Sequence, residues 1–164
     1  MTAEPDFTIR PILPGDPAIP TVADWRHRAW FAAEGFTPEQ SVAQLQDMAA
    51  RCAGQPQGFE TALICAIGKE PVGTVLLIER EYEQLHDVSP WLAGLYVVPG
   101  RRGNGIGRRL VSAVEERAGR WGFGRIYLYT ADADAFYARL GWQVQDDFDW
   151  DGDRFCLMVR DLAT

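Results

Sequence analysis

The chain has 164 residues, enough for one hydrophobic core and short for two, so we expect a single domain over residues 1–164. Hydrophobic residues make up 47% of it, too many for a disordered chain, and no run approaches the roughly 18 apolar residues that a membrane helix needs. The formal net charge of −7 argues against a phosphate-binding surface for nucleic acids, and three cysteines without a CxxC pair argue against a disulfide framework or a zinc site, so we expect a cytoplasmic protein without nucleic-acid, membrane or metal partners.

The first half of the chain predicts a strand, two helices and a hairpin. A T-P-E-Q capping box opens the second helix, and apolar, β-branched runs form the hairpin and indicate central strands. The predicted elements are a strand from Phe7 to Leu13, a helix from Val22 to Ala33 after a Thr21 cap, a helix from Pro38 to Cys52, and strands from Thr61 to Ile67 and from Val72 to Glu81.

The second half alternates strands and helices before a final hairpin. Its long helix, after the glycines, is expected to bury residues at a spacing near four, namely Ile106, Leu110, Val114, Ala118 and Trp121. The other predicted elements are strands from Trp91 to Val98 and from Ile126 to Thr130, a short helix from Asp132 to Leu140, and two strands about the turn 150–153. The order β-α-α-β-β-β-α-β-α-β-β predicts an α+β fold with a mixed sheet.

A glycine- and arginine-rich loop, "VVPGRRGNGIGRRLV", joins the strand at Trp91 to the long helix. Glycines between a strand and a helix N-terminus let backbone N–H groups approach a phosphate, and the helix dipole favours the anion. The loop lacks the third glycine of a dinucleotide fingerprint and the Gly-Lys-Ser/Thr ending of a P-loop. From the glycines alone, a flexible turn and a site for another anion both stay open.

Two ordered motifs resemble those of the GNAT superfamily of N-acetyltransferases. The signature Arg/Gln-x-x-Gly-x-Gly/Ala is met by Arg102, Gly105 and Gly107, and "AFYARLGW" at 135–142 is similar to the family's FYxxLGF segment. The resemblance implies a GNAT-like, mostly antiparallel mixed sheet of about seven strands flanked by four helices. It also implies transfer of an acetyl group from acetyl-coenzyme A to a primary amine, with no metal.

The resemblance places coenzyme A along one strand and one loop. Backbone groups of Leu95, Tyr96 and Val97 are expected to bond the pantetheine arm as an added strand would, and the loop amides are expected to hold the pyrophosphate. Thr130 stands where many members carry an asparagine, and we treat its hydroxyl as a cofactor-side group. The loop residues expected to contact the coenzyme are Arg102, Gly103, Asn104, Gly105, Ile106, Gly107 and Arg108.

Two catalytic groups are expected from the family's chemistry. The tyrosine of the FYxxLGF-like segment, Tyr137, is expected to protonate the leaving thiolate. Without the motif, the sequence would favour an aromatic side chain that packs in the core. The family's carboxylate base on the strand before the loop has no counterpart here, because 91–98 contains no Asp or Glu. We expect Glu79 to take that role, and the other candidates are Glu34, Glu81, Glu83, His86 and Asp87.

The acceptor is open, as either a small-molecule amine or a protein or peptide amine, and the chain is either a monomer or a homodimer. Aromatic and acidic side chains of the first two helices and the C-terminal hairpin suit a cationic amine, or else form core and solvated surface. They are Trp25, Trp30, Phe31, Phe36, Phe148, Trp150, Asp146, Asp147, Asp149, Asp151 and Asp153. Two alternatives to an enzyme are a non-catalytic module that binds a coenzyme A thioester and a phosphate-binding module of another fold.

Overall fold

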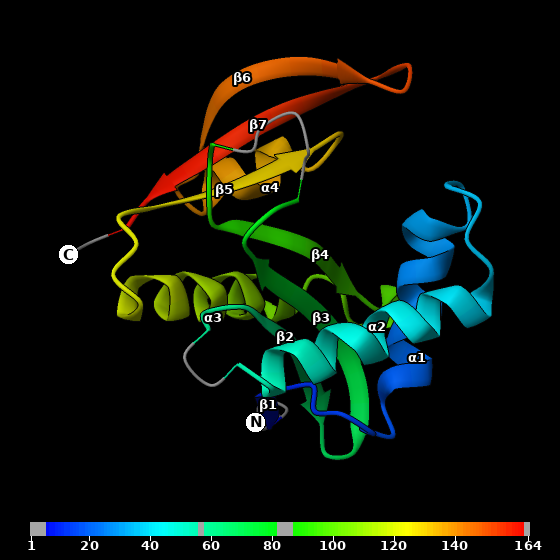
Figure 1. Ribbon diagram of the computed structural model, residues 1–164. Coiled ribbons are helices and arrows are strands. Elements are labelled where there is room, and N and C mark those ends of the chain that lie inside the picture. The colour runs from blue at the N-terminus through cyan, green and yellow to red at the C-terminus, as the bar shows by residue number, and fades with distance from the viewer. Residues whose placement is uncertain (1–5, 56–57, 82–86, 163–164) are drawn as a thin grey trace.

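One sheet of seven strands, in the order β1-β2-β3-β4-β5-β7-β6, runs through the molecule (Figure 1). The computed structural model describes residues 6–55, 58–81 and 87–162. Neighbouring strands are antiparallel except for β4 and β5, which are parallel. The strands are β1 (Phe7–Pro11), β2 (Thr61–Ile67), β3 (Glu70–Ile78), β4 (Trp91–Val97), β5 (Arg125–Thr130), β6 (Gln143–Trp150) and β7 (Asp153–Asp161). The expected mixed, mostly antiparallel α+β fold is confirmed.

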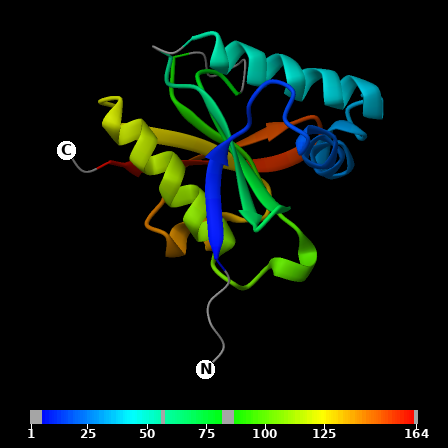
Figure 2. The same cartoon turned by 90° about the horizontal axis from the view of Figure 1, so that it is seen from below.

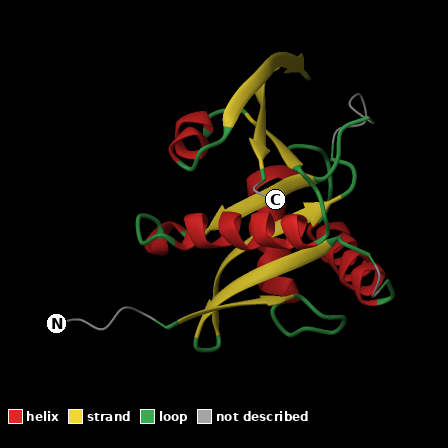
Figure 3. Cartoon of the chain, turned by 90° about the vertical axis from the view of Figure 1, so that its left-hand side faces the viewer, coloured by secondary structure: helices red, strands yellow, loops and turns green. Residues whose placement is uncertain are grey.

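Helices cover both faces of the sheet (Figure 2). Residues of α1 and α2 pack with Ile64 and Trp91 in one core, and residues of α3 pack with Val75 and Leu128 in a second core on the opposite face. The short α4 lies beside the β6–β7 hairpin (Figure 3). The helices are α1 (Ile19–Arg26), α2 (Pro38–Ala53), α3 (Ile106–Arg120) and α4 (Asp134–Arg139).

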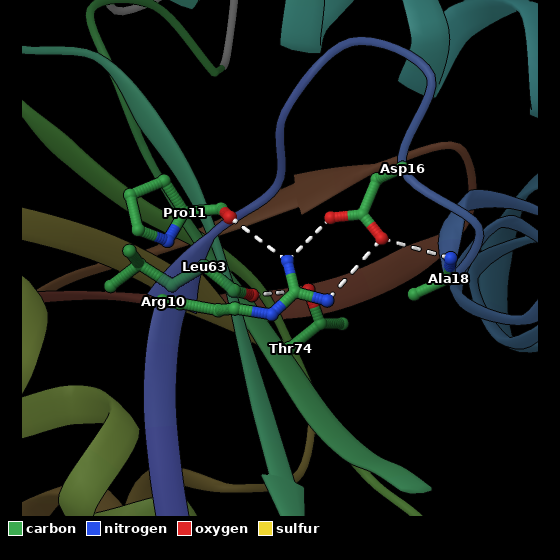
Figure 4. Close-up of polar contacts among 6 residues, drawn as sticks. All are labelled: Arg10, Pro11, Asp16, Ala18, Leu63 and Thr74. Carbon is green, nitrogen blue, oxygen red and sulfur yellow. Dashed lines mark hydrogen bonds and ion pairs between the residues drawn. The ribbon is translucent and has the colours of Figure 1, made fainter. Parts of the chain in front are cut away.

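The first helix begins three residues earlier than the sequence predicts, and Thr21 is not its cap. Ala18 is the N-cap residue and no side chain caps the helix, but the Asp16 carboxylate accepts a hydrogen bond from the Ala18 N–H at 2.9 Å, just before the helix begins (Figure 4). Arg10 of β1 holds Asp16 in place by a paired contact to both carboxylate oxygens. In the same view Thr74 donates to the Leu63 carbonyl, which ties β3 to β2 at 2.8 Å. The capping box that opens α2 at Thr37 is confirmed.

The first helix also does not continue regularly to Ala33. After Arg26 the chain widens into a π-helical turn, His27–Phe31, closed by a bond from the Ala32 N–H to the His27 carbonyl at 2.8 Å. Such turns insert one residue into the helical repeat, and they occur often at functional sites. The wider turn rotates Trp30 and Phe31 away from the register that a regular helix would give them.

Trp121 is the exception among the residues predicted to be buried by the long helix. The other four are buried, but Trp121 is 42% exposed because α3 ends at Arg120 and Gly122 turns the chain with a positive φ. The predicted turn of the last hairpin is confirmed, and Asp151 and Gly152 both have positive φ there.

The two parallel strands in the middle of the sheet separate almost as soon as they meet (Figure 1). Only Trp91 and Tyr127 are paired between β4 and β5. On its other edge β4 carries a bulge, where Gly94 and Leu95 stand opposite the single residue Val75 of β3. Gly94 adopts φ +61°, a backbone conformation that favours glycine. The second half of β4 therefore turns away from β5 and leaves its backbone groups unpaired on that side.

Candidate active site

A cavity of about 980 Å³ passes through the sheet where β4 and β5 separate. Its lining combines Leu45 and Leu76, which belong to the core under α1 and α2, with Leu128 and Tyr137, which belong to the core under α3. The cavity thus borders both cores, which lie on opposite faces of the sheet. That geometry suits a reaction between two substrates that enter from opposite sides.

The glycine-rich loop ends at the N-terminus of α3, on the side of the second core. Gly105 is the N-cap residue with φ +81°, and no side chain caps the helix. The first N–H groups of α3 are thus left to another acceptor, as in anion sites at helix N-termini. Gly103 precedes it with φ +84°, and Gly107 lies against Phe136 of α4. The N-terminus of α3 and this loop, which we call the cradle, are thus left open to an anion.

Three of the four arginines of the loop contact other groups of the protein. Arg102 donates from Nε to the Val97 carbonyl at 2.8 Å and stacks over the Tyr96 ring at 5.4 Å. Arg101 pairs with Glu70 at 3.5 Å, and Arg109 lies 5.1 Å from the Phe7 ring centre. Arg108 lines a second, shallow hollow along α3, and Asn104 donates to the Arg101 carbonyl at 3.2 Å.

The predicted pantetheine strand lies in the part of β4 beyond its contact with β5, and of its three residues only Leu95 is among those that line the cavity. Leu95 lines the cavity, Tyr96 packs against the first core and Val97 against the second. Thr130, at the end of β5, also lines it, and its hydroxyl accepts a hydrogen bond from the Ala133 N–H at 3.0 Å. This bond shapes the turn that leads into α4.

Tyr137 projects from α4 into the same cavity. Its side chain is 6% exposed, and its ring packs edge-on against Phe136 and Trp142. Within the described ranges no hydrogen bond occupies its hydroxyl. Burial raises the pKa of Tyr137, so the hydroxyl stays protonated at every physiological pH.

Three of the candidate bases line the cavity: Glu34, Glu79 and Glu81. Glu79 and Glu34 are exposed, whereas Glu81 is half-buried and accepts a hydrogen bond from the Tyr129 hydroxyl at 3.0 Å. Burial is the main cause that raises the pKa of Glu81. Asp87 is exposed and not part of the lining, and Glu83 and His86 lie outside the described residues.

The predicted acceptor residues divide between the cavity and the rest of the molecule. Trp30, Phe31 and Trp150 line the cavity, whereas Trp25 is buried and stacks on Tyr96 at 5.5 Å. Phe36 packs on Phe31, and Phe148 stacks on Phe155. The five hairpin aspartates are all exposed and none lines the cavity, so its carboxylates come from other segments.

Arg26 is the cavity residue that the sequence analysis missed. It ends α1 with 6% of its side chain exposed, and its Nη1 atom is buried without a hydrogen-bond partner in the part of the chain that the structure describes. The signal was present in the sequence, because Ile19, Val22 and Arg26 follow the spacing of one helix face. A charged residue on that apolar face indicates a special role.

Neither a metal site nor a membrane-spanning helix is found among the described residues. No group of three or more histidines, cysteines or acidic residues is arranged to hold a metal ion there. None of the helices in those ranges has the length and hydrophobicity needed to cross a bilayer.

The model of the acetyltransferase (GNAT) family matches residues 19–142 of this chain. Among solved structures, aminoglycoside 6'-N-acetyltransferase complexed with coenzyme A is 20% identical with a TM-score of 0.70, over 96% of this chain and 98% of that one. Aminoglycoside 6'-acetyltransferase type Ii is 23% identical with a TM-score of 0.71, over 96% and 98%. The Salmonella typhimurium protein yncA, solved with acetyl-CoA, is 16% identical with a TM-score of 0.71, over 96% and 94%. No curated protein sequence matches the chain.

Proposed function

Because the chain belongs to the GNAT family of acetyltransferases, we propose that it transfers the acetyl group of acetyl-coenzyme A to a primary amine by direct attack on the thioester. The observation that carries the proposal is the cavity that opens through the sheet between β4 and β5. Coenzyme A and acetyl-CoA accompany two structural relatives with this fold. The cradle at the α3 N-terminus would hold the pyrophosphate on one side, and the amine would enter the cavity from the other.

The coenzyme would be held mainly by backbone groups. A Cβ atom added at Gly103 or Gly105 would meet nothing within 4 Å, so the backbone is open to a ligand there, and the positive end of the α3 dipole would favour the pyrophosphate. The unpaired edge of β4 at Leu95–Val97 would bond the pantetheine arm, and Thr130 would flank it from β5. Arg102 holds the end of β4 to the loop, so it would contribute both position and charge.

The chemical step needs a proton donor and a proton acceptor. The amine nitrogen forms a bond to the carbonyl carbon, the C–S bond breaks, and the departing thiolate takes a proton. Tyr137 is the proposed donor, since its protonated hydroxyl lies in the cavity with no competing hydrogen bond among the described residues. Backbone N–H groups of β4 near the bulge would stabilise the tetrahedral oxyanion.

The incoming ammonium must lose a proton before it can attack, so a carboxylate is needed on the side of the cavity opposite Tyr137. Glu79 and Glu81 both line the cavity within one short segment after β3. The backbone N–H of Glu79 is held by Glu60 at 3.0 Å, whereas the Glu81 carboxylate itself is fixed by Tyr129. A fixed, half-buried carboxylate is better matched to proton transfer than an exposed one. We therefore propose Glu81 alongside Glu79 and rank it first.

Calorimetric titration with acetyl-CoA, with NAD and ATP as controls, tests the cofactor. We expect micromolar binding of acetyl-CoA and no binding of the controls. Equal or exclusive binding of a control would contradict the proposed function. Release of free thiol in the presence of amines then separates an acyltransferase from a module that only binds the thioester.

A further inference from the structure

Arg26 places a buried positive charge at the acceptor side of the cavity. Its Nη1 atom is shielded from solvent and lacks a hydrogen-bond acceptor in the described ranges, and its guanidinium carbon stands 5.2 Å from the Phe31 ring centre. Burial lowers the pKa of Arg26 to about 10, so the group is still charged at neutral pH. A buried charge without a direct partner is costly, and such a group is normally paired. An anionic ligand would supply such a partner.

Glu81 does not fill that role. Its charge acts on Arg26 through space, yet the two side chains are not within the 4.0 Å of a salt bridge. The hydrogen bond from Tyr129 at 3.0 Å fixes the Glu81 carboxylate on the β5 side instead. One cavity thus holds a cation and a carboxylate that face the same space without touching.

The cation also lies next to the strand on which the thioester is expected. A Cβ atom added to Gly94 would stand 3.2 Å from Arg26 Nη1, so the guanidinium rests directly on the β4 bulge. Gly94 and Leu95 line the cavity at the point where β4 has left β5. A ligand held by Arg26 would therefore lie close to the part of β4 on which the thioester is expected.

We propose that the acceptor carries a carboxylate a few bonds from its reacting amine, as an amino acid does, with Arg26 binding the carboxylate and Glu81 facing the amine. This inference rests on the proposed acetyl transfer. A guanidinium pairs well with a carboxylate through two parallel hydrogen bonds. A polycationic amine without an anionic group would instead bring further positive charge to a cation that already lacks a direct partner.

Matched acceptors test the role of the carboxylate. The initial rate of thiol release from acetyl-CoA is measured with the common L-amino acids, with their carboxamides, and with the corresponding amines that lack the carboxyl group. We expect kcat/KM for the preferred amino acid to exceed that of its carboxamide on the order of 10- to 100-fold, as for a charge-assisted hydrogen bond. Equal values, or acetylation of the carboxamides and amines alone, would overturn the inference.

Variants at position 26 connect that preference to the arginine. In Arg26→Gln we expect the amino acid to lose most of its advantage while the carboxamide keeps its kcat/KM. Arg26→Lys retains the positive charge but loses the two parallel N–H donors of the guanidinium, so we expect an intermediate preference for the amino acid over its carboxamide. Arg28→Gln is the matched control, since Arg28 is exposed and pairs with Asp24 at 2.7 Å, and its preference should equal that of the unmodified protein. An unchanged preference in Arg26→Gln would overturn the assignment.

Failure of this inference is distinguishable from failure of the proposed function. Acetylation of amines without any preference for a carboxylate contradicts the inference and leaves acetyl transfer standing. Acetylation of no amino acid also contradicts it, and the calorimetric titration with acetyl-CoA then shows whether the proposed function fails as well. If Arg26→Gln does not fold, the substrate series and Arg26→Lys still decide the question.

Discussion

At the scale of single residues, three side chains in the cavity hold protonation states that suit their proposed roles. Burial keeps the Tyr137 hydroxyl protonated and raises the pKa of Glu81. Burial also lowers the pKa of Arg26 to about 10, which still leaves the guanidinium charged at neutral pH. Each shift has the same cause, removal from water, but the consequences differ with the chemistry of the group. The site thus maintains a proton donor, an anion binder and a proton acceptor within one space.

Tyr137→Phe removes one oxygen atom from a well-packed ring. We expect kcat to fall about 10- to 1000-fold, since a positioned acid contributes on the order of 10²–10⁴ and part of that assistance passes to water. The KM for acetyl-CoA and the melting temperature should not change, because the ring contacts with Phe136 and Trp142 remain. Steady-state kinetics at saturating amine measure the effect, and an unchanged kcat would rule out the acid role.

The acidic limb of the pH profile reports on Glu81. A base must be ionised, so kcat/KM should fall as the pH drops through a pKa above the ordinary 4.5 of a glutamate. The Tyr129 hydrogen bond lowers that pKa, so Tyr129→Phe should move the limb to higher pH. Glu81→Gln should remove the limb together with most of the activity. A limb that stays in place in Tyr129→Phe and persists in Glu81→Gln would assign the base elsewhere, with Glu79→Gln as the next variant.

Arg26 should cost stability in the absence of an acceptor. Its folded-state pKa is lowered, so the penalty is present in full below about pH 10 and is relieved only above it. Arg26→Met should therefore raise the free energy of unfolding by about 1–3 kcal/mol while impairing acceptor binding. Urea denaturation at pH 7 measures the gain, with Arg28→Met as a control expected within about 0.5 kcal/mol of the unmodified protein. A loss of stability in Arg26→Met would show that Arg26 is structural.

At the scale of elements, local rules predicted those parts of the fold that local interactions govern. The capping box at Thr37, the buried spacing along α3 and the Asp151–Gly152 turn follow from neighbours in sequence. The start of α1 does not, because the Ala18 N–H that precedes the helix is bound by Asp16, which Arg10 of β1 holds in place. The π-helical turn after Arg26 likewise has no local signal, so the predicted helix to Ala33 was wrong at that point.

The candidate site also combines residues that the sequence predicts with residues that only the fold brings together. Motifs located Tyr137 and the loop from Arg102 to Gly107, because the family resemblance fixes both by position in the chain. Arg26 and the pairing of Glu81 with Tyr129 join segments that are far apart in sequence, and only the folded sheet brings them to one cavity. Charged groups on a predicted apolar helix face remain the best sequence signal for such residues.

The N-terminus of α3 carries a prediction of its own. Gly105→Val should weaken acetyl-CoA binding at least about 10-fold, since φ +81° strains a branched residue and a side chain enters the space beside the amides. Gly119→Ala is the matched control within the same helix, where a Cβ meets nothing within 4 Å. It should leave binding unchanged and add about 0.5–1 kcal/mol of stability. Calorimetry with acetyl-CoA compares the two, and full affinity in Gly105→Val would place the phosphates elsewhere.

At the scale of the whole molecule, one sheet joins two cores. Strands such as β3 contribute Leu76 to one core and Val75 to the other, so neither core can lose its packing alone. We expect a single unfolding transition, with tryptophan fluorescence and far-ultraviolet circular dichroism giving the same midpoint. Acetyl-CoA at 100 times its Kd should raise the free energy of unfolding by about 2.7 kcal/mol. Two separated midpoints would contradict the single-domain prediction.

The position of β6 at the end of the sheet has a consequence for solubility. A strand at the edge of a sheet presents unpaired backbone groups to other molecules. β6 is such a strand, it is eight residues long, and nearly all of its side chains are exposed. Asp146 and Asp149 stand along it, on either side of Asp147, which pairs with Arg154 at 2.8 Å, so two copies that approach edge to edge bring like charges together. This charge repulsion between copies acts only while the carboxylates are ionised. Acidification, rather than heating at neutral pH, is therefore the condition under which this protein should first form intermolecular sheets.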